Sequence, residues 1–379
     1  MARRTALLPF LTLVCAGLLP STAHALARIP QPPEPLFQVV GEHINESSGL
    51  AVSADGKRYY TVPDAGRPAE VYAVDGKGKT KVILALPQPE LNEDWEDVAV
   101  ARAADGTGQL YIADTGDAFV ARTAGSLPER TSYRLLRVTE PAASASGRVA
   151  LAGNQVEVFT LVYADGAPHN SEALLVHPVT GKVFLVEKAE KAGRKSGLWS
   201  VPGALKASGS NVLRQALADL KIVGVSGAAF SPDGDRVVIR NATTAYLWWI
   251  EDEDVAKSMR AKPIEIDLPV QRQGEGVAFT PDGRSLLVNS EGLNQPMWRV
   301  PLPADAATGG AEPELPGQDP AQLAAPPAGG DGLMFAVAGL AGVAAAGVLA
   351  LAVVRGRRGP AGVKAVSPPP AAAGEGRPL

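Results

Sequence analysis

Carboxylate side chains recur at two positions of a pattern that the chain repeats five times. The first position holds glutamate in three copies and serine in two; the second holds an acidic residue in three copies, a lysine in one and an asparagine in one. The acidic residues at these positions are Glu96, Glu172, Glu275, Asp64, Asp114 and Glu291. Carboxylates held close together raise one another's pKa unless a cation neutralises them, and such oxygen-rich sets suit Ca²⁺ or Mg²⁺. These six residues are therefore the candidate metal ligands, with Ca²⁺ as the candidate ion.

Each copy of the pattern predicts a β-hairpin. The copies begin at Ser47, Glu93, Asn170, Val225 and Gln273. Each contains an apolar run, a tight turn and a second apolar run, and the turn is clearest in the Ser-Pro-Asp-Gly sequence of residues 231–234. In such a turn Pro presets φ, Asp bonds to the backbone and Gly adopts a positive φ. Two apolar runs joined in this way are typical of a hairpin.

Further apolar runs extend each hairpin into a small sheet. We expect a third strand after every hairpin and a fourth after the first four, the latter over residues 81–87, 155–163, 217–223 and 263–269. The fifth copy lacks its own fourth strand, whereas an unassigned strand at 37–44 precedes the first copy. Adding that N-terminal strand to the last sheet closes a ring and covers edges that an open array would expose.

These sheets predict an all-β fold, a β-propeller of five blades closed by the N-terminal strand. The copies lie roughly 50 residues apart, but about 76 separate the second and third. The extra length forms a long loop over 115–132 or an additional blade, so six blades is the alternative. The hairpin pattern, with its Phe-Ser-Pro-Asp-Gly turn, resembles bacterial TolB-like and WD-repeat-like propellers over residues 37–302. Propellers host binders, scaffolds and enzymes alike, so this resemblance indicates fold and not function.

In a propeller the first strand of each blade lines the central channel, and its start lies on the same face as the end of the second strand. The resemblance therefore implies that the six candidate ligands approach one channel mouth, with Asp97, Asp117 and Glu187 nearby. Three interpretations remain open. The carboxylates accept hydrogen bonds between blades or pair with Lys188 and Arg240, or they hold a metal without catalysis, or they form a catalytic centre.

Composition agrees with a large β domain. The chain has 379 residues, of which 46% are hydrophobic, and it contains 40 Gly and 32 Pro. This is too rich in turn formers for a helical bundle and too apolar for disorder. The one cysteine, Cys15, lies in the N-terminal apolar stretch, so the mature chain has no thiolate metal site and no disulfide framework.

Two apolar segments predict export and membrane anchoring. Residues 1–25 combine Arg3 and Arg4, an apolar core and an Ala-His-Ala cleavage pattern, which is typical of a secretory signal peptide. A linker at 26–36 follows. Residues 333–354 carry no charge and, at 1.5 Å per residue, span roughly 33 Å as a helix, enough to cross a bilayer. A Pro/Ala/Gly-rich linker at 303–332 precedes this predicted transmembrane helix, and the arginines that follow it place the tail 355–379 in the cytoplasm.

The predicted outside portion is acidic. The whole chain carries −4, the signal peptide +2 and the tail +4, which leaves residues 26–354 at −10. An acidic ectodomain does not bind nucleic acid electrostatically, so cations, basic peptides or metal ions are the expected partners.

The sequence favours a binding module over an enzyme. G-x-S-x-G, a phosphate loop and G-x-G-x-x-G are all absent from the sequence. We therefore expect a cell-membrane protein with an extracellular propeller that binds a ligand or a protein, with a divalent metal as part of the site. The alternative is a metal-dependent extracellular hydrolase resembling propeller phytases or lactonases, whose signature segments are missing here. In that case His169, near Glu172, is a candidate base. A purely structural surface protein is the third hypothesis.

Overall fold

The computed structural model describes residues 31–307, apart from 42, 65–67, 118–128 and 190–195. The chain divides into two units, 1–315 and 316–379, and the described residues all belong to the first. The predicted signal peptide, transmembrane helix and tail lie outside the described residues. Within the described ranges, no helix is both long enough and apolar enough to cross a bilayer.

Antiparallel hairpins form over all five repeated segments. Their strand pairs are β2 (Ser47–Val52) with β3 (Arg58–Pro63), β6 (Trp95–Arg102) with β7 (Gly108–Asp114), β11 (Ser171–Val176) with β12 (Val183–Glu187), β15 (Gly227–Phe230) with β16 (Arg236–Arg240), and β19 (Gly274–Phe279) with β20 (Ser285–Ser290). Each connecting turn contains a glycine with φ between +65° and +85°, a conformation that side chains with a Cβ rarely adopt. This requirement explains why glycine recurs in the repeated turn.

Outer strands extend these hairpins. The third strands are β4 (Glu70–Asp75), β8 (Tyr133–Thr139), β13 (Leu198–Ser200), β17 (Thr244–Trp249) and β21 (Pro296–Pro301). The fourth strands are β5 (Thr80–Ala85), β10 (Val156–Tyr163), β14 (Ser210–Leu217) and β18 (Ile264–Asp267). The N-terminal strand β1 (Glu34–Gln38) pairs antiparallel with β21 and so completes the last sheet, as the sequence predicts, but it overlaps the expected range 37–44 only at Phe37 and Gln38.

One outer strand differs from its prediction. The fourth strand of the third copy was expected at 217–223, but β14 ends at Leu217. Leu220 and Ile222 are buried without belonging to a strand, and Lys221 and Gly224 both have positive φ. The apolar residues that suggested a strand therefore belong to a turn packed against the core, and the strand is the more polar segment before it.

Two parallel pairings link neighbouring sheets. β10 pairs with β14, which joins two sheets into one of eight strands in the order β11-β12-β13-β14-β10-β8-β7-β6. The edge strands β6 and β11 of this sheet also contact each other, so it is nearly closed. A short strand that the sequence did not suggest, β9 (Gly147–Ala150), pairs in parallel with β5.

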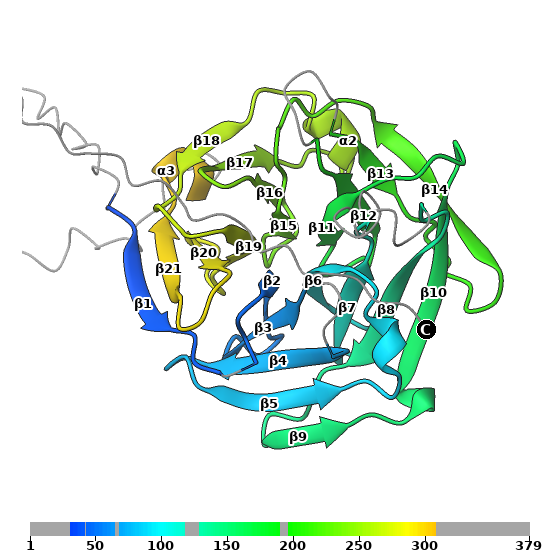
Figure 1. Ribbon diagram of the computed structural model, residues 1–379. Helices are drawn as coiled ribbons and strands as arrows, with labels where there is room; N and C mark the ends of the chain where they lie inside the picture. Colours follow the sequence, from blue (N-terminus) through cyan, green and yellow to red (C-terminus); the bar gives the residue numbers. More distant parts are fainter. Residues whose placement is uncertain (1–30, 42, 65–67, 118–128, 190–195, 308–379) are drawn as a thin grey trace, which may run out of the picture. The chain divides into compact units, whose positions relative to one another are not determined.

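The first strands of the five hairpins contact one another in a cycle. β2 contacts β6, β6 contacts β11, β11 contacts β15, β15 contacts β19, and β19 contacts β2. Figure 1 shows these five strands at the centre and the other strands outside them. The helical elements are short: η1 (Pro89–Leu91), η2 (Gly153–Gln155), α2 (Val255–Ser258) and α3 (Ala304–Ala307). The described part of the chain is thus all-β, in an arrangement compatible with a β-propeller.

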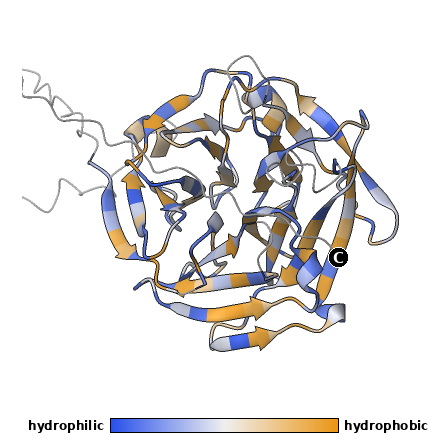
Figure 2. Cartoon of the chain, in the orientation of Figure 1, coloured by the Kyte–Doolittle hydropathy of each residue, from blue (hydrophilic) through white to orange (hydrophobic). Residues whose placement is uncertain are grey.

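Apolar side chains fill the spaces between neighbouring sheets. Hydrophobic residues recur along the strands (Figure 2), and their buried side chains form a separate cluster between each pair of adjacent sheets. Trp95 and Trp199 are fully buried in two of these clusters. The adjacent Trp248 and Trp249 pack into different clusters, because successive side chains of a strand point to opposite faces. Each sheet is packed on both faces, and this packing fixes the positions of the residues at its strand ends.

Candidate functional site

Asp64 lies directly after β3 and is held by two neighbouring segments. Its backbone N–H donates to the carbonyl oxygen of Glu46 at 3.1 Å. Asn92 Nδ2 donates to the carbonyl oxygens of Pro63 and Asp64, each at 3.3 Å. Asn92 therefore ties the end of β3 to the segment that leads into β6.

The same asparagine helps to position Asp94 and Glu96. Asn92 Oδ1 accepts a hydrogen bond from the backbone N–H of Trp95 at 3.2 Å. The Trp95 indole is fully buried, and its Nε1 donates to the carbonyl oxygen of Leu91 at 2.6 Å. Because consecutive side chains point in opposite directions, anchoring Trp95 in the core turns its two acidic neighbours the other way.

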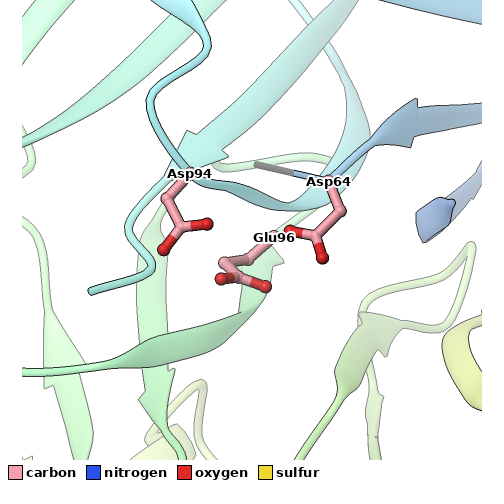
Figure 3. A group of neighbouring side chains, drawn as sticks. All are labelled: Asp64, Asp94 and Glu96. Carbon is pink, nitrogen blue, oxygen red and sulfur yellow. The ribbon is translucent and has the colours of Figure 1, made fainter. Parts of the chain in front are cut away.

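Asp64, Asp94 and Glu96 converge, as Figure 3 shows. Each offers one carboxylate oxygen, and these oxygens lie within 4.8 Å of one another. With Ca–O distances of 2.3–2.6 Å, two oxygens bound to one ion lie at most about 5 Å apart. Asp94 and Glu96 are buried and Asp64 is partly exposed, so the group is open on one side. Its geometry fits a hard cation with room for further oxygen ligands.

Gly116 leaves the space that this group needs. A Cβ atom at this position would lie 2.0 Å from Glu96 Oε1 and 2.3 Å from Asp94 Oδ2, far inside van der Waals contact. The Gly116 N–H donates to the carbonyl oxygen of Asp94 at 3.2 Å, which keeps the glycine backbone against the two carboxylates. Every other residue type would displace them.

Serines fill the first position in the two copies that lack glutamate there. Ser48 Oγ donates to the carbonyl oxygen of Glu96 at 2.6 Å. Ser226 Oγ donates to the carbonyl oxygens of Gly274, at 2.9 Å, and Glu275, at 3.2 Å. Each serine thus donates to the backbone of the next first strand around the cycle. The acceptor is the carbonyl oxygen of the glutamate at the first repeated position of that strand, joined for Ser226 by the carbonyl of the preceding glycine.

Glu172, Glu275 and Glu291 lie in the same electrostatic environment as the three converging carboxylates. Glu172 accepts hydrogen bonds from Lys188 Nζ at 3.1 Å and Asn170 Nδ2 at 2.8 Å. Burial lowers the pKa of Lys188, but the negative charges of Glu172, Glu96 and Glu275 outweigh it and raise that pKa above its ordinary value. We call the set of Asp64, Asp94, Glu96, Glu172, Glu275, Glu291 and Lys188 the acidic mouth.

Burial, and after it the crowding of negative charge, raises the carboxyl pKa values in the acidic mouth. Burial raises the pKa of Glu96 well above its usual range, and the charges of Glu172 and Asp94 raise it further. The pKa of Glu275 rises to about 8 through burial and then the charge of Glu172. The pKa of Glu291 rises to about 7 through burial and then the charge of Asp64. Such values are common at sites that bind a cation or transfer a proton.

Asp114, the sixth predicted ligand, does not join the acidic mouth. Its buried carboxylate forms ion pairs with Arg130, at 3.3 Å, and with Arg134. It also accepts the backbone N–H of Asp94 at 2.8 Å. Two arginines neutralise the charge of Asp114. Its hydrogen bond to the Asp94 N–H positions the backbone at Asp94.

Asp97 follows Glu96 on β6, is fully buried and links several first strands. Its Oδ1 accepts the N–H of Val98 at 2.8 Å, and its Oδ2 accepts those of Leu174 at 2.8 Å and Ala228 at 3.4 Å. Burial raises its pKa to about 8, and the backbone amides that bond to it lower the pKa. Asp97 thus has the structural role that the sequence left open for acidic residues at strand ends.

His169 has carboxylate partners at both ring nitrogens. Its Nε2 lies 3.1 Å from Asp165 Oδ2 and its Nδ1 lies 3.0 Å from Glu187 Oε1. The ring also packs against Tyr163 and Trp199. Burial lowers its pKa, but Glu187 and Asp165 outweigh burial and raise it overall. A ring held in this way joins two segments and has no nitrogen directed at the acidic mouth, which argues against a role as base.

Asp94 is the ligand candidate that the repeat did not reveal. It is not at either repeated position, because it precedes the aligned glutamate by two residues. The signal available was the local run Glu93–Asp97, in which four of five residues are acidic. No protein-family model matches the chain, and no curated protein sequence matches it either.

Proposed function

We propose that the described part of the chain is a five-bladed β-propeller. Support comes from the cycle of contacts among five first strands and from the addition of β1 to the last sheet. The long interval between the second and third copies contributes β8 and β10 to the second blade and β9 to the outer edge of the first. This use of the interval favours five blades over six.

We further propose that this propeller is a membrane-anchored, extracytoplasmic binding module with a divalent cation, Ca²⁺ first, at Asp64, Asp94 and Glu96. The single observation that carries the proposal is the convergence of three carboxylate oxygens within 4.8 Å against a glycine whose Cβ would displace two of them. A cation there relieves the repulsion that otherwise raises the pKa of Glu96. The remaining carboxylates of the acidic mouth would attract a cationic group of the ligand.

Membrane anchoring rests on the sequence. The apolar segments at 1–25 and 333–354 support it, and the described chain ends at Ala307, about 25 residues before the second of them. That linker is long enough to hold a folded domain outside the bilayer.

A second candidate function, a metal-dependent hydrolase of phosphate or lactone esters, is favoured by one feature. Glu275 and Glu291, with pKa values near 8 and 7, can exchange protons at neutral pH beside a bound cation. A turnover assay on an ester panel separates this function from binding.

Thermal unfolding of the full chain in nanodiscs of a zwitterionic lipid tests the metal proposal. A ligand at 100 times its Kd stabilises the folded state by about 2.7 kcal/mol, which raises Tm by about 5 °C for a domain of this size. We expect that rise with Ca²⁺ and its reversal by a chelator. The double variant Asp94→Asn/Glu96→Gln should lose the rise, whereas Glu265→Gln, on an exposed outer strand, should keep it. An unchanged Tm with Ca²⁺ and with Mg²⁺ would refute the site.

A further inference from the structure

The face opposite the acidic mouth carries a separate cavity of about 440 Å³. The ends of the five first strands and the hairpin turns beyond them line it. Each first strand contributes an apolar side chain: Val52, Val100, Val176, Phe230 and Phe279. Small-molecule sites commonly occupy ~300–1,000 Å³. The cavity therefore has the size and the lining of a site for an apolar ligand.

Asp97 separates this cavity from the acidic mouth. The cavity wall includes Val98, Leu174 and Ala228, whose backbone N–H groups donate to the Asp97 carboxylate. Asp97 satisfies these three N–H groups, and the apolar side chains of the first strands line the cavity beside them. The two sites can consequently be occupied and tested independently.

Polar side chains at the rim bond to their own or a neighbouring hairpin turn. Ser53 Oγ donates to Asp55 Oδ1 at 2.7 Å, and Ser231 Oγ donates to Asp233. Arg102 donates to the carbonyl oxygens of Gly106, at 3.2 Å, and Ala54. These bonds already satisfy polar groups at the rim, which favours an occupant without a large polar surface.

The chain leaves the described domain on this same face. Arg236 Nη1, which is buried, donates to the carbonyl oxygens of Gly283 at 2.7 Å, Ala306 at 3.1 Å and Ala307 at 3.2 Å. Its guanidinium also lies 5.3 Å from the ring of Phe279, a cavity wall residue. The helix α3, with the last described residue, is therefore fixed to the hairpin turns that surround the cavity.

We infer that the cavity binds one acyl chain, taken from a bilayer lipid or from a free fatty acid. The apolar side chains of the five first strands and the volume of the cavity indicate the ligand class, and the proposed membrane anchoring offers a bilayer as one source. Only the choice of the bilayer as source rests on the proposed membrane anchoring. Acyl binding itself requires neither the anchor nor a cation at the acidic mouth.

Photo-crosslinking of the full chain in nanodiscs tests this inference. One arm uses a phospholipid with a diazirine in its acyl chain, and the other uses ordinary nanodiscs with a soluble diazirine fatty acid. We expect labels, mapped by mass spectrometry, within 50–56, 98–102 and 278–281. Excess unlabelled fatty acid should reduce them at least fivefold. Val100→Trp, which fills the cavity, should reduce them equally, while Val270→Trp, at a residue 97% exposed, should not.

The outcomes are separable. Labels in both arms support acyl binding from the bilayer, and labels in the fatty-acid arm alone support acyl binding from solution. Labels in neither arm, or labels that excess fatty acid does not displace, overturn the inference. Because displacement uses the unmodified chain, the result stands even if Val100→Trp fails to fold, and Val52→Trp serves as a second filled variant. The Ca²⁺ melting experiment reports separately on the acidic mouth.

Discussion

The carboxylate of Asp114 accepts the backbone N–H of Asp94 at 2.8 Å. This bond joins a buried ion-pair network to the loop that carries one of the three converging carboxylates. The repeat assigns Asp114 to the same position as Asp64, yet the two residues differ in charge compensation: Arg130 and Arg134 neutralise Asp114. Asp114 positions the backbone at Asp94, whereas Asp64 contributes a carboxylate oxygen to the converging group.

Asp114→Ala should destabilise the fold and weaken cation binding together. It removes the buried carboxylate partner of Arg130, which leaves only the exposed Glu93 carboxylate beside that guanidinium, and it removes the acceptor of the Asp94 N–H. Removing one partner of a buried ion pair costs ~3–5 kcal/mol. Urea denaturation should show a loss of about 3 kcal/mol. The matched control is Glu157→Ala, which breaks the exposed pair with Arg137 and should cost under about 1 kcal/mol. Equal losses for the two variants would contradict this assignment.

Gly116→Ala should abolish Ca²⁺ binding. The added methyl group would overlap Glu96 Oε1 and Asp94 Oδ2, so the two carboxylates must separate. Isothermal titration should show at least a hundredfold weaker affinity. Gly203→Ala is the control, because a Cβ there meets nothing within 4 Å and the backbone is not in the left-handed region. Normal Ca²⁺ affinity in Gly116→Ala would show that the cation binds elsewhere.

The sequence predicts the hairpins well because each depends on local turn chemistry and on two nearly continuous apolar runs, which are buried along most of their length. It also predicts that Glu96, Glu172, Glu275 and Glu291 share one environment, since repeated positions become neighbours when the first strands contact in a cycle. The repeated positions did not predict that two arginines neutralise Asp114. Arg130 lies in the long loop before β8 and Arg134 lies on β8, outside the two repeated positions, so no aligned position indicates their contacts.

Outer strands were harder to predict than inner ones. β14 carries Asn211, Arg214 and Gln215 and exposes much of one face, so its hydrophobicity is lower than that of the turn that follows. β9 exposes most of its residues and is defined by pairing with β5, a segment distant in sequence. Propensity and periodicity do not report such long-range pairing.

Asp97→Ala should destabilise the fold more than any change within the acidic mouth. It leaves the buried N–H groups of Leu174 and Ala228 without their acceptor, in two different first strands. Each unsatisfied buried donor costs ~1–3 kcal/mol. Urea denaturation should therefore show a loss of at least 3 kcal/mol, with Asp97→Asn less affected because its carbonyl oxygen can still accept. A loss below 1 kcal/mol for Asp97→Ala would exclude a linking role.

Stability without metal should fall as pH rises from 6 to 9. The folded-state pKa of Glu275 is about 8 and that of Glu291 about 7, both above the ordinary value of 4.5. A carboxyl group whose pKa is raised by folding binds its proton more tightly in the folded state. Its contribution is therefore fully present below about pH 4.5 and is lost as pH rises through 7 to 8.

Ca²⁺ should reverse this trend, because ionised carboxylates bind the cation and protons compete with it. Melting curves at pH 6, 7, 8 and 9 should show Tm falling in chelator, and a gap between Ca²⁺ and chelator that widens with pH. Glu275→Gln removes one titrating group, so its Tm in chelator should fall less across this range. Glu265→Gln, exposed on β18, should titrate like the unmodified chain. A Tm in chelator that rises from pH 6 to 9 would show that these carboxyl groups are already ionised in the folded protein, and that the acidic mouth is neutralised by its own basic residues.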